Sequence, residues 1–532
     1  MNSRTLFGPA AVTLLWPLLA SAIPEGPAYP SVAWTQREAQ NYAIVSQAPL
    51  EQTGNPAFTA QWQAQSLANQ QSWLARAAAD SSWLAPASGN TPLTPVCTQW
   101  TQLCTGDPFR YAGTDPFYLS EGETAPVVFY DSACARLSGR IWKPLNIPAN
   151  IRLPGVIIET GSIAAPETLY WWAAQTLVRA GYVVMTFDVR GQGRSDFLTP
   201  SGGAGSDIDP TVFWTDLVDA IDFFRSSPQQ VYPNNKACAG SYPTVVNDFN
   251  PDAAIIDAAR LGLAGHSSGA TGVSVVQGYG GAGAQPWPGK IDKLNPVKVV
   301  VAWDGLFNPD GSGGGGANGT QPAVGAAIFP NGTLPKFAIR VPALDLDSEY
   351  GIDPVPYISP PDPEGNKLAY AQWRAAGVPV FGITIRGSTH FDFSLLPGFP
   401  ASSWCPQIQN GECSGGWGIA LAQHYTVAWL DRWLKLPGEP GYADADQRLL
   451  DDNGPQGRVK MSFYSRSARS FPDREGAMHH CEDIRAGCTD MTVSSTVSGS
   501  GAGSMNANTL VVMWLLFLLN ARARTLRRNW PP

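Results

Sequence analysis

Between residue 127 and about residue 436, short apolar runs alternate with segments whose apolar residues recur at helical spacing. Runs such as "GVIIETG", "YVVMTFD" and "VKVVVAWD" are apolar at almost every position, which is typical of strands that are buried on both faces. Such an alternation predicts an α/β fold with a mostly parallel sheet and helices on both of its faces. The expected strands cover residues 127–131, 135–142, 155–161, 182–188, 261–267, 297–304, 341–347 and 378–387, and the expected helices cover 166–181, 211–226, 268–278, 366–377 and 418–435.

The two ends of the chain differ from this central part in composition. Arg4, a following apolar run and Ala20-Ser21-Ala22 have the order of a secretory signal peptide with its cleavage site. The next hundred residues are rich in Ala and Gln and then loop-like, which predicts an extension of helix and loop. The predicted organisation is a signal peptide (1–22), an N-terminal extension (23–125), a central domain (126–440), a cysteine-containing extension (441–493) and a low-complexity tail (494–532).

The tail contains one short apolar segment, Leu510 to Leu519, which is followed by four arginines. This segment is much shorter than the roughly 18 to 20 residues that a membrane-spanning helix needs. A run of small residues from Ser494 to Ser504 precedes it. This order of small residues, apolar segment and Arg cluster is similar to the C-terminal sorting signals of some exported bacterial proteins, where the arginines stay on the cytoplasmic side. A membrane tether and a frayed apolar tail are therefore both kept as interpretations.

The cysteines, like the predicted signal peptide, indicate that the protein is exported. Eight cysteines agree with export, because disulfides persist in oxidising compartments. We therefore expect a secreted, periplasmic or cell-surface protein. Sequence spacing does not determine connectivity. Three pairs could close small loops, Cys97 with Cys104, Cys405 with Cys413 and Cys481 with Cys488, which leaves Cys134 and Cys238.

Charge and composition exclude several classes of partner. The whole chain has a net charge of −8, and five of its positive charges lie in the signal peptide and the tail, so residues 23–504 carry −13. A body this acidic is repelled by nucleic acid and by anionic lipid surfaces. The sequence has no CxxC pair and no Cys/His cluster with zinc-ligand spacing. We expect neither a metal nor another cofactor.

The pentapeptide Gly265-His266-Ser267-Ser268-Gly269 joins the end of an expected strand to the start of an expected helix. Pentapeptides of this kind arise by chance in Gly- and Ser-rich chains, so the context decides their meaning. A nucleophile elbow needs this context, because the sharp turn presents the serine oxygen above the sheet and the flanking glycines avoid clashes. The context predicts Ser267 as a nucleophile.

A serine nucleophile needs a base, and the chain has five histidines. His266 adjoins the nucleophile and should point elsewhere, His424 lies within the last expected helix, and His479 and His480 lie beside cysteines. His390 follows the last expected strand, where catalytic groups gather in open α/β sheets. Position and elimination predict His390 as the base.

The acid that orients the base should lie between them in chain order. Asp304 ends one expected strand, and Asp345, Asp347 and Glu349 lie on or just after the next one. A carboxylate beyond either strand can reach the imidazole. Periodicity does not choose among them.

Residues 127–436 resemble the α/β-hydrolases, and within them the platelet-activating-factor acetylhydrolase group and related bacterial secreted esterases. The resemblance rests on "TGSIAAPETLYWWAAQTLVRAGYVVMTFDVRGQGRSD", "LGLAGHSSGAT", "VAWDGLF", "PALDLDSEY" and "ITIRGSTHFDF". In the acetylhydrolase group the acid ends the strand after the nucleophile helix, which implies Asp304. Many other α/β-hydrolases place it after the next strand, which would select Asp347 or Glu349.

The resemblance also implies the rest of the machinery. Backbone N–H groups of Ser162 and Ser268 would form the oxyanion hole, with Thr160 standing where a histidine is commonest in the family. The segment "DVRGQGRSD" would be structural or border the site, since it lacks the order of a phosphate-binding loop.

The predicted function is that of a secreted serine hydrolase. It would cleave small-molecule or lipid carboxylic esters through a Ser-His-Asp triad and an acyl-enzyme, without a cofactor. The alternatives are a peptidase of the same fold, because triad geometry does not select ester over amide, and a non-catalytic hydrolase-like binding protein. Binding proteins of that kind have typically lost a triad member, and all three members are present here.

Overall fold

The computed structural model describes most of the central and C-terminal parts of the chain. The expected signal peptide, the tail and nearly all of the N-terminal extension lie outside the described residues. The described residues are 117–162, 165–206, 208–310, 334–349, 367–386, 388, 390–394, 407–409, 412–414, 418–462 and 465–488, with Val32, Gln36 and Ala78.

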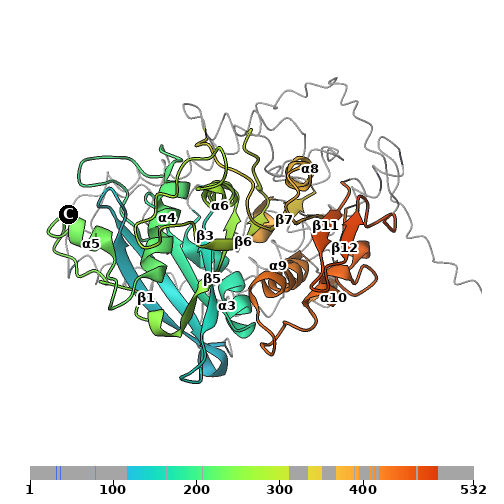
Figure 1. The fold of residues 1–532 in the computed structure, drawn as a ribbon, viewed down its shortest axis with the longest axis horizontal. Coiled ribbons are helices and arrows are strands. Elements are labelled where there is room, and N and C mark those ends of the chain that lie inside the picture. The colour runs from blue at the N-terminus through green and yellow to red at the C-terminus, as the bar shows by residue number, and fades with distance from the viewer. Residues whose placement is uncertain are drawn as a thin grey trace, which may run out of the picture.

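The described strands form a ten-stranded mixed sheet in the order β1-β2-β4-β3-β5-β6-β7-β8-β11-β12. The six central strands from β4 to β8 are parallel, and the pairs at both edges are antiparallel. Figure 1 shows this sheet running from the blue β1 to the red hairpin of β11 and β12. The mostly parallel sheet that the sequence predicts is confirmed. The strands are β1 (Gly122–Tyr130), β2 (Arg136–Pro144), β3 (Leu153–Glu159), β4 (Val183–Asp188), β5 (Ile256–His266), β6 (Val297–Trp303), β7 (Ala343–Ser348), β8 (Val380–Ile385), β11 (Ala468–Pro472) and β12 (Met478–Cys481), while β9 (Gln407–Gln409) and β10 (Glu412–Ser414) pair separately.

Helices cover both faces of the sheet, because the central strands are apolar on both. Successive strand side chains point to opposite faces. Thus Val156 and Ile158 of β3 belong to one core, together with side chains of α3 and α9. Ile157, which lies between them, belongs to a second core with side chains of α4, α6 and α8. This layered arrangement is an α/β-hydrolase-like fold, as predicted. The helices are α3 (Trp171–Arg179), α4 (Val212–Arg225), α5 (Pro233–Ala237), α6 (Ser268–Gly278), α8 (Leu368–Ala375), α9 (Gly418–Leu434) and α10 (Ala445–Leu450).

The segment 441–493, which the sequence sets apart as an extension, contributes α10 and two strands to the same layers. Strand β11 pairs antiparallel with β8, and β12 continues the sheet beyond it. Leu449 of α10 and Phe471 of β11 are buried in the core under α9. The extension therefore packs as part of the sheet domain.

Two disulfides lie within the described residues. Cys134 in the turn between β1 and β2 bonds to Cys238 at the end of α5, and Cys481 bonds to Cys488 after β12. The other four cysteines cannot be described in this way, because Cys97, Cys104 and Cys405 lie outside the described residues, as does the side chain of Cys413. Disulfides are typical of proteins from oxidising compartments. Among the helices that the structure describes, none combines the length and apolarity needed to cross a bilayer.

Candidate active site

Ser267 occupies a sharp turn between the end of β5 at His266 and the start of α6 at Ser268. Its backbone has φ 56° and ψ −121°, a conformation that L-residues rarely adopt. Two backbone hydrogen bonds hold it there: the Ser267 N–H donates to the Trp303 oxygen (3.1 Å), and the Thr271 N–H donates to the Ser267 oxygen (3.1 Å). The turn therefore ties the nucleophile candidate to the neighbouring strand β6.

Both glycines of the pentapeptide are required by close backbone contacts. A Cβ atom at Gly265 would lie 2.3 Å from the Gly269 oxygen. A Cβ atom at Gly269 would lie 2.4 Å from the Thr160 oxygen, in the loop that follows β3. Any larger residue at these positions would force the backbone apart, which explains the Gly-x-Ser-x-Gly spacing physically.

His390 and Asp304 lie at the same edge of the sheet as Ser267. Asp304 follows β6 directly, and His390 opens a short 3-10 turn after β8. Their side chains meet, with Nδ1 of His390 2.5 Å from Oδ2 of Asp304. Ser348 at the end of β7 donates to both oxygens of the same carboxylate, from its N–H to Oδ1 (2.7 Å) and from its hydroxyl to Oδ2 (2.7 Å).

These contacts keep Asp304 ionised inside the protein. Burial alone would raise the pKa of Asp304, but the hydrogen bonds from His390 and Ser348 and the proximity of the imidazole together hold it below its usual value. An ionised carboxylate against Nδ1 fixes the imidazole tautomer, because Nδ1 must carry the proton. The second nitrogen, Nε2, is then the one that can accept a proton.

The two alternative acids have different surroundings. Asp347 is buried and shares a hydrogen bond with Asp345, and burial raises the pKa of both carboxyls well above the usual range. Glu349 is also buried, and its Oε1 accepts a hydrogen bond from the Ser462 hydroxyl (2.5 Å). It is Asp304 that occupies the Nδ1 side of the imidazole.

The two residues expected to form an oxyanion hole lie next to each other. The hydroxyl oxygens of Ser162 and Ser268 are 2.8 Å apart. Ser268 is the first residue of α6, so its N–H has no acceptor within the helix. The helix N-terminus also favours negative charge at this point. The position suits an oxygen that becomes negative during acyl transfer.

The loop that carries Ser162 is held by a buried side chain that sequence reasoning did not single out. Gln192 donates from Nε2 to the Gly161 oxygen (2.8 Å) and to the Thr160 hydroxyl (3.2 Å). Its Oε1 accepts the N–H of Ala165 (2.9 Å). Gln192 comes from "DVRGQGRSD", so this segment borders the site. Only these tertiary hydrogen bonds show that Gln192 holds the loop, because no local sequence pattern predicts them.

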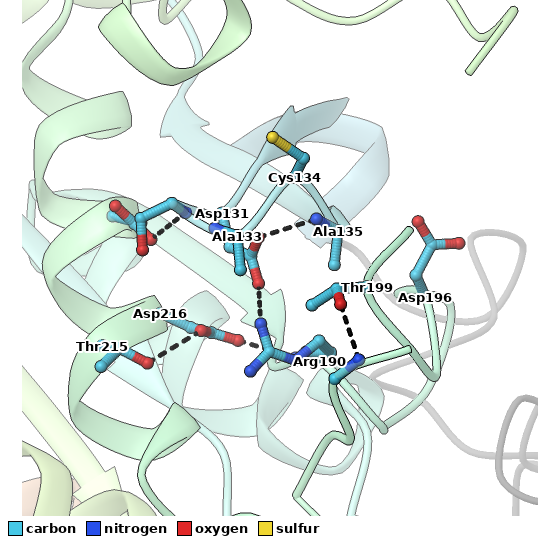
Figure 2. Close-up of polar contacts among 12 residues, drawn as sticks. Asp131, Ala133, Cys134, Ala135, Arg190, Asp196, Thr199, Thr215 and Asp216 are labelled. Carbon is cyan, nitrogen blue, oxygen red and sulfur yellow. Dashed lines mark hydrogen bonds and ion pairs between the residues drawn. The ribbon is translucent and has the colours of Figure 1, made fainter. Parts of the chain in front are cut away.

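The loop after β4 (residues 189–196), which carries Gln192, is itself fixed at both ends. Near its start the Arg190 guanidinium pairs with Asp131, and the Arg190 N–H donates to Asp216 (2.9 Å) (Figure 2). At its end Asp196 pairs with Arg136 (2.7 Å). All of these side chains are buried, so the loss of one partner of an ion pair would leave an uncompensated charge in the interior.

The histidines outside the site are engaged elsewhere. His424 lies on α9, in agreement with the expected helix, whereas His479 and His480 lie on β12, a strand that the sequence did not predict. Their ring contacts run from His424 Nε2 to the Arg448 backbone oxygen (3.1 Å), from His479 Nε2 to Asp473 Oδ2 (2.8 Å) and from His480 Nε2 to Glu482 Oε1 (3.1 Å). Over the part of the chain that the structure describes, no three His, Cys, Asp or Glu side chains are grouped to bind a metal ion.

Comparison with known proteins gives distant likenesses only. No protein-family model matches the chain, and no curated protein matches it. Among solved structures, it is similar to a thermophilic esterase from the Planctomycetes species Thermogutta terrifontis, in a butyrate-bound form, with 15% identity and a TM-score of 0.33 over 48% of this chain and 81% of that one. It is also similar to a ferulic acid esterase from Streptomyces cinnamoneus, with 16% identity and a TM-score of 0.34 over 59% of this chain and 89% of that one.

Proposed function

We propose that the chain is a secreted serine hydrolase that cleaves carboxylic esters. Ser267 is the nucleophile, His390 the general base and acid, and Asp304 the carboxylate that orients the imidazole. The backbone N–H groups of Ser162 and Ser268 stabilise the oxyanion. The observation that carries the proposal is the 2.5 Å contact between His390 Nδ1 and Asp304 Oδ2 at the sheet edge where the strained turn presents Ser267.

The reaction follows from the direction of these hydrogen bonds. His390 Nε2 takes the hydroxyl proton of Ser267 as the serine oxygen attacks the acyl carbon, and the resulting oxyanion accepts hydrogen bonds from the N–H groups of the oxyanion hole. When the C–O bond to the alcohol breaks, the imidazolium returns the proton to the leaving oxygen. Water then attacks the acyl-enzyme by the same route, with His390 taking its proton, and releases the acid and the free serine.

The position of the acid supports the finer family resemblance. Asp304 directly follows the strand after the nucleophile helix, which is the place of the acid in the platelet-activating-factor acetylhydrolase group. We therefore propose kinship with that group and its secreted bacterial relatives. We propose a small-molecule or lipid ester as the substrate. The net negative charge of residues 23–504 makes nucleic acid an unsuitable partner.

Export is part of the proposal. The disulfides of Cys134 with Cys238 and of Cys481 with Cys488 support an oxidising destination, in agreement with the predicted signal peptide. We further propose that the tail around residues 510–519 attaches the protein to a membrane. Fractionation of cells that express the full chain, compared with a chain ending at residue 504, tests it.

A fluorophosphonate probe and p-nitrophenyl esters of increasing acyl length test the hydrolase. The purified protein should be labelled and should hydrolyse at least one ester, and Ser267→Ala should abolish both while the protein stays folded. Ser227→Ala is the matched control, because it removes a serine hydroxyl whose hydrogen bond to the Gln230 N–H lies in an exposed turn. Labelling that persists in Ser267→Ala would refute the nucleophile. Hydrolysis of p-nitroanilides but not of esters would select the peptidase, and a folded protein without labelling or turnover would select the binding protein.

A further inference from the structure

His266 stands between the glycine and the nucleophile of the elbow, and its side chain lies in the interior. The residue is 4% exposed. Its ring lies 4.6 Å from the ring of His390, measured between centroids. Both of its nitrogens are used: Nδ1 lies 2.9 Å from the Tyr170 hydroxyl, and Nε2 lies 2.8 Å from the backbone oxygen of His390.

The chemistry of the partners fixes the direction of each hydrogen bond. A backbone carbonyl only accepts, so Nε2 of His266 carries the proton and donates a hydrogen bond to the backbone oxygen of His390. Nδ1 is then bare and accepts the Tyr170 O–H. The Tyr170 oxygen in turn accepts the N–H of Gly161 (3.0 Å), the residue before Ser162.

These bonds form one directed chain through the elbow. It begins at Gly161 in the loop that carries Ser162, here called the oxyanion loop. It passes through Tyr170 and His266 and ends on the backbone oxygen of His390. The chain works with one tautomer of a neutral ring, since in the other tautomer a bare Nε2 would face the carbonyl oxygen of His390, and two acceptors form no hydrogen bond. Burial, together with the neighbouring His390, lowers the pKa of His266 to about 3, so the ring stays neutral at every working pH.

We propose that His266 is a positioning residue that holds the backbone of the base and the oxyanion loop to the nucleophile elbow as one unit. The proposal rests on the proposed function for its kinetic consequences, but the hydrogen-bond chain exists independently of turnover. Its effect is geometric, because a catalytic group displaced by about 1 Å can lose about 10²-fold in rate. His390 is thus held at two points, at its imidazole by Asp304 and at its backbone oxygen by His266.

Two substitutions separate the hydrogen bonds of His266 from its volume. His266→Phe keeps a flat ring of similar size and removes both bonds. His266→Gln places an amide nitrogen near the position of Nε2 and keeps a donor for the carbonyl of His390. Tyr170→Phe removes one hydroxyl and breaks the same chain from its other end, so it serves as a second variant should His266→Phe fold poorly.

Histidine-selective ¹⁵N labelling gives a readout that needs no substrate, because the chain has five histidines in all. The wild-type protein should show a downfield Nδ1 proton from the bond between His390 and Asp304. This signal should persist in His266→Gln and be lost or broadened in His266→Phe, because the unanchored backbone of His390 no longer holds its ring against Asp304. Stopped-flow ester hydrolysis of the same proteins gives kcat and KM separately.

The expected kinetic result is a fall in kcat of about 10²-fold in His266→Phe with KM within about twofold, and recovery of at least about tenfold in His266→Gln. A folded His266→Phe protein that keeps both the downfield proton and the wild-type kcat overturns the inference, as does a Gln variant no better than Phe. Should the wild-type protein neither label nor turn over, the hydrolase proposal fails, and the contrast in the proton signal still decides the positioning role.

Discussion

Ser348 donates two hydrogen bonds to Asp304, one from its backbone N–H and one from its hydroxyl, each 2.7 Å long. The last residue of β7 thereby holds the carboxylate that follows β6, and both oxygens of Asp304 have fixed directions. The bond between Asp304 and His390 is thus part of a larger arrangement that joins the carboxyl ends of β6, β7 and β8.

Removal of the Ser348 hydroxyl should destabilise the protein in a pH-dependent way. Asp304 has a lowered pKa, so its stabilising contribution is present above the unfolded pKa of about 4 and is lost as the pH falls through the folded pKa. Ser348→Ala should lower the free energy of unfolding by about 1.5–3 kcal/mol at pH 7 and by less at pH 3. Urea unfolding measures both. Ser274→Ala removes a buried neutral hydroxyl and should give a difference that does not change with pH.

Asp304→Asn should lower kcat for a p-nitrophenyl ester by about 10⁴-fold with little loss of folding, because the amide would favour the wrong imidazole tautomer. Asp347→Asn and Glu349→Gln should each lower kcat far less, because these two side chains are hydrogen-bonded to Asp345 and Ser462, respectively. A Glu349→Gln protein as inactive as Asp304→Asn would transfer the role of the acid to the later strand.

The Asp345–Asp347 pair predicts a stability that falls as the pH rises. Burial raises the pKa of both carboxyls, so the folded protein keeps protons that the unfolded chain loses above a pH of about 4. The state that binds more protons is favoured at lower pH, so the loss begins near pH 4 and continues toward the raised folded pKa. Asp347→Asn keeps a neutral hydrogen-bonding partner for Asp345. Its free energy of unfolding should decline less steeply between pH 5 and 8 than that of the wild-type protein, and parallel curves would contradict the pairing.

Gln192→Leu should reduce kcat by up to about 10²-fold, the scale of losing one oxyanion donor, because the loop of Ser162 loses three hydrogen bonds. Gln277→Leu is the matched control, since Gln277 is equally buried and bonds to Ala338 and Arg340 at the far end of α6. The control should lose stability and keep its kcat. Equal kinetic losses in both variants would mean that Gln192 acts only on folding.

Replacement of both Cys134 and Cys238 by alanine should lower the free energy of unfolding by about 4–5 kcal/mol, because the bond closes a loop with a sequence separation of 104. Urea unfolding without reductant measures this. Mass mapping of unreduced peptides should recover this pair and Cys481 with Cys488, and it tests the expected pairs Cys97 with Cys104 and Cys405 with Cys413. Free thiols at all eight positions would contradict an oxidising compartment.

The central elements were predictable because burial imposes a period on the sequence. Helix α6 has the predicted bounds of residues 268–278, and α9 differs from its prediction by one residue. Strand β5 begins at Ile256, before the predicted residue 261, because its first residues, "IDAAR", are partly exposed and lack the apolar run. Strands β11 and β12 escaped prediction for a related reason, since "ARSFP" and "MHHC" are short and contain proline or histidine.

The sequence predicted Ser267 and His390 at one sheet edge, but periodicity did not choose the carboxylate between them, and only the family resemblance favoured Asp304. Asp304 directly follows β6, and Asp347 is the last residue but one of the parallel neighbour β7, so the topology brings both toward the same edge. A contact of 2.5 Å distinguishes them, and such a distance depends on how the strands are staggered. Tyr170 and Gln192 were missed because their importance lies in partners that are remote in sequence or lack any pattern.

The left-handed backbone of Ser267 sets protein stability against reactivity at a single residue. Glycine adopts such a conformation freely, whereas serine carries a cost of order 1–3 kcal/mol that the rest of the fold must offset. Among the twenty amino acids, the one most at ease in this turn is therefore one without a hydroxyl. A lineage under selection for thermal stability alone is expected to replace this serine by glycine, so a serine that persists here would measure the strength of selection for its hydroxyl group.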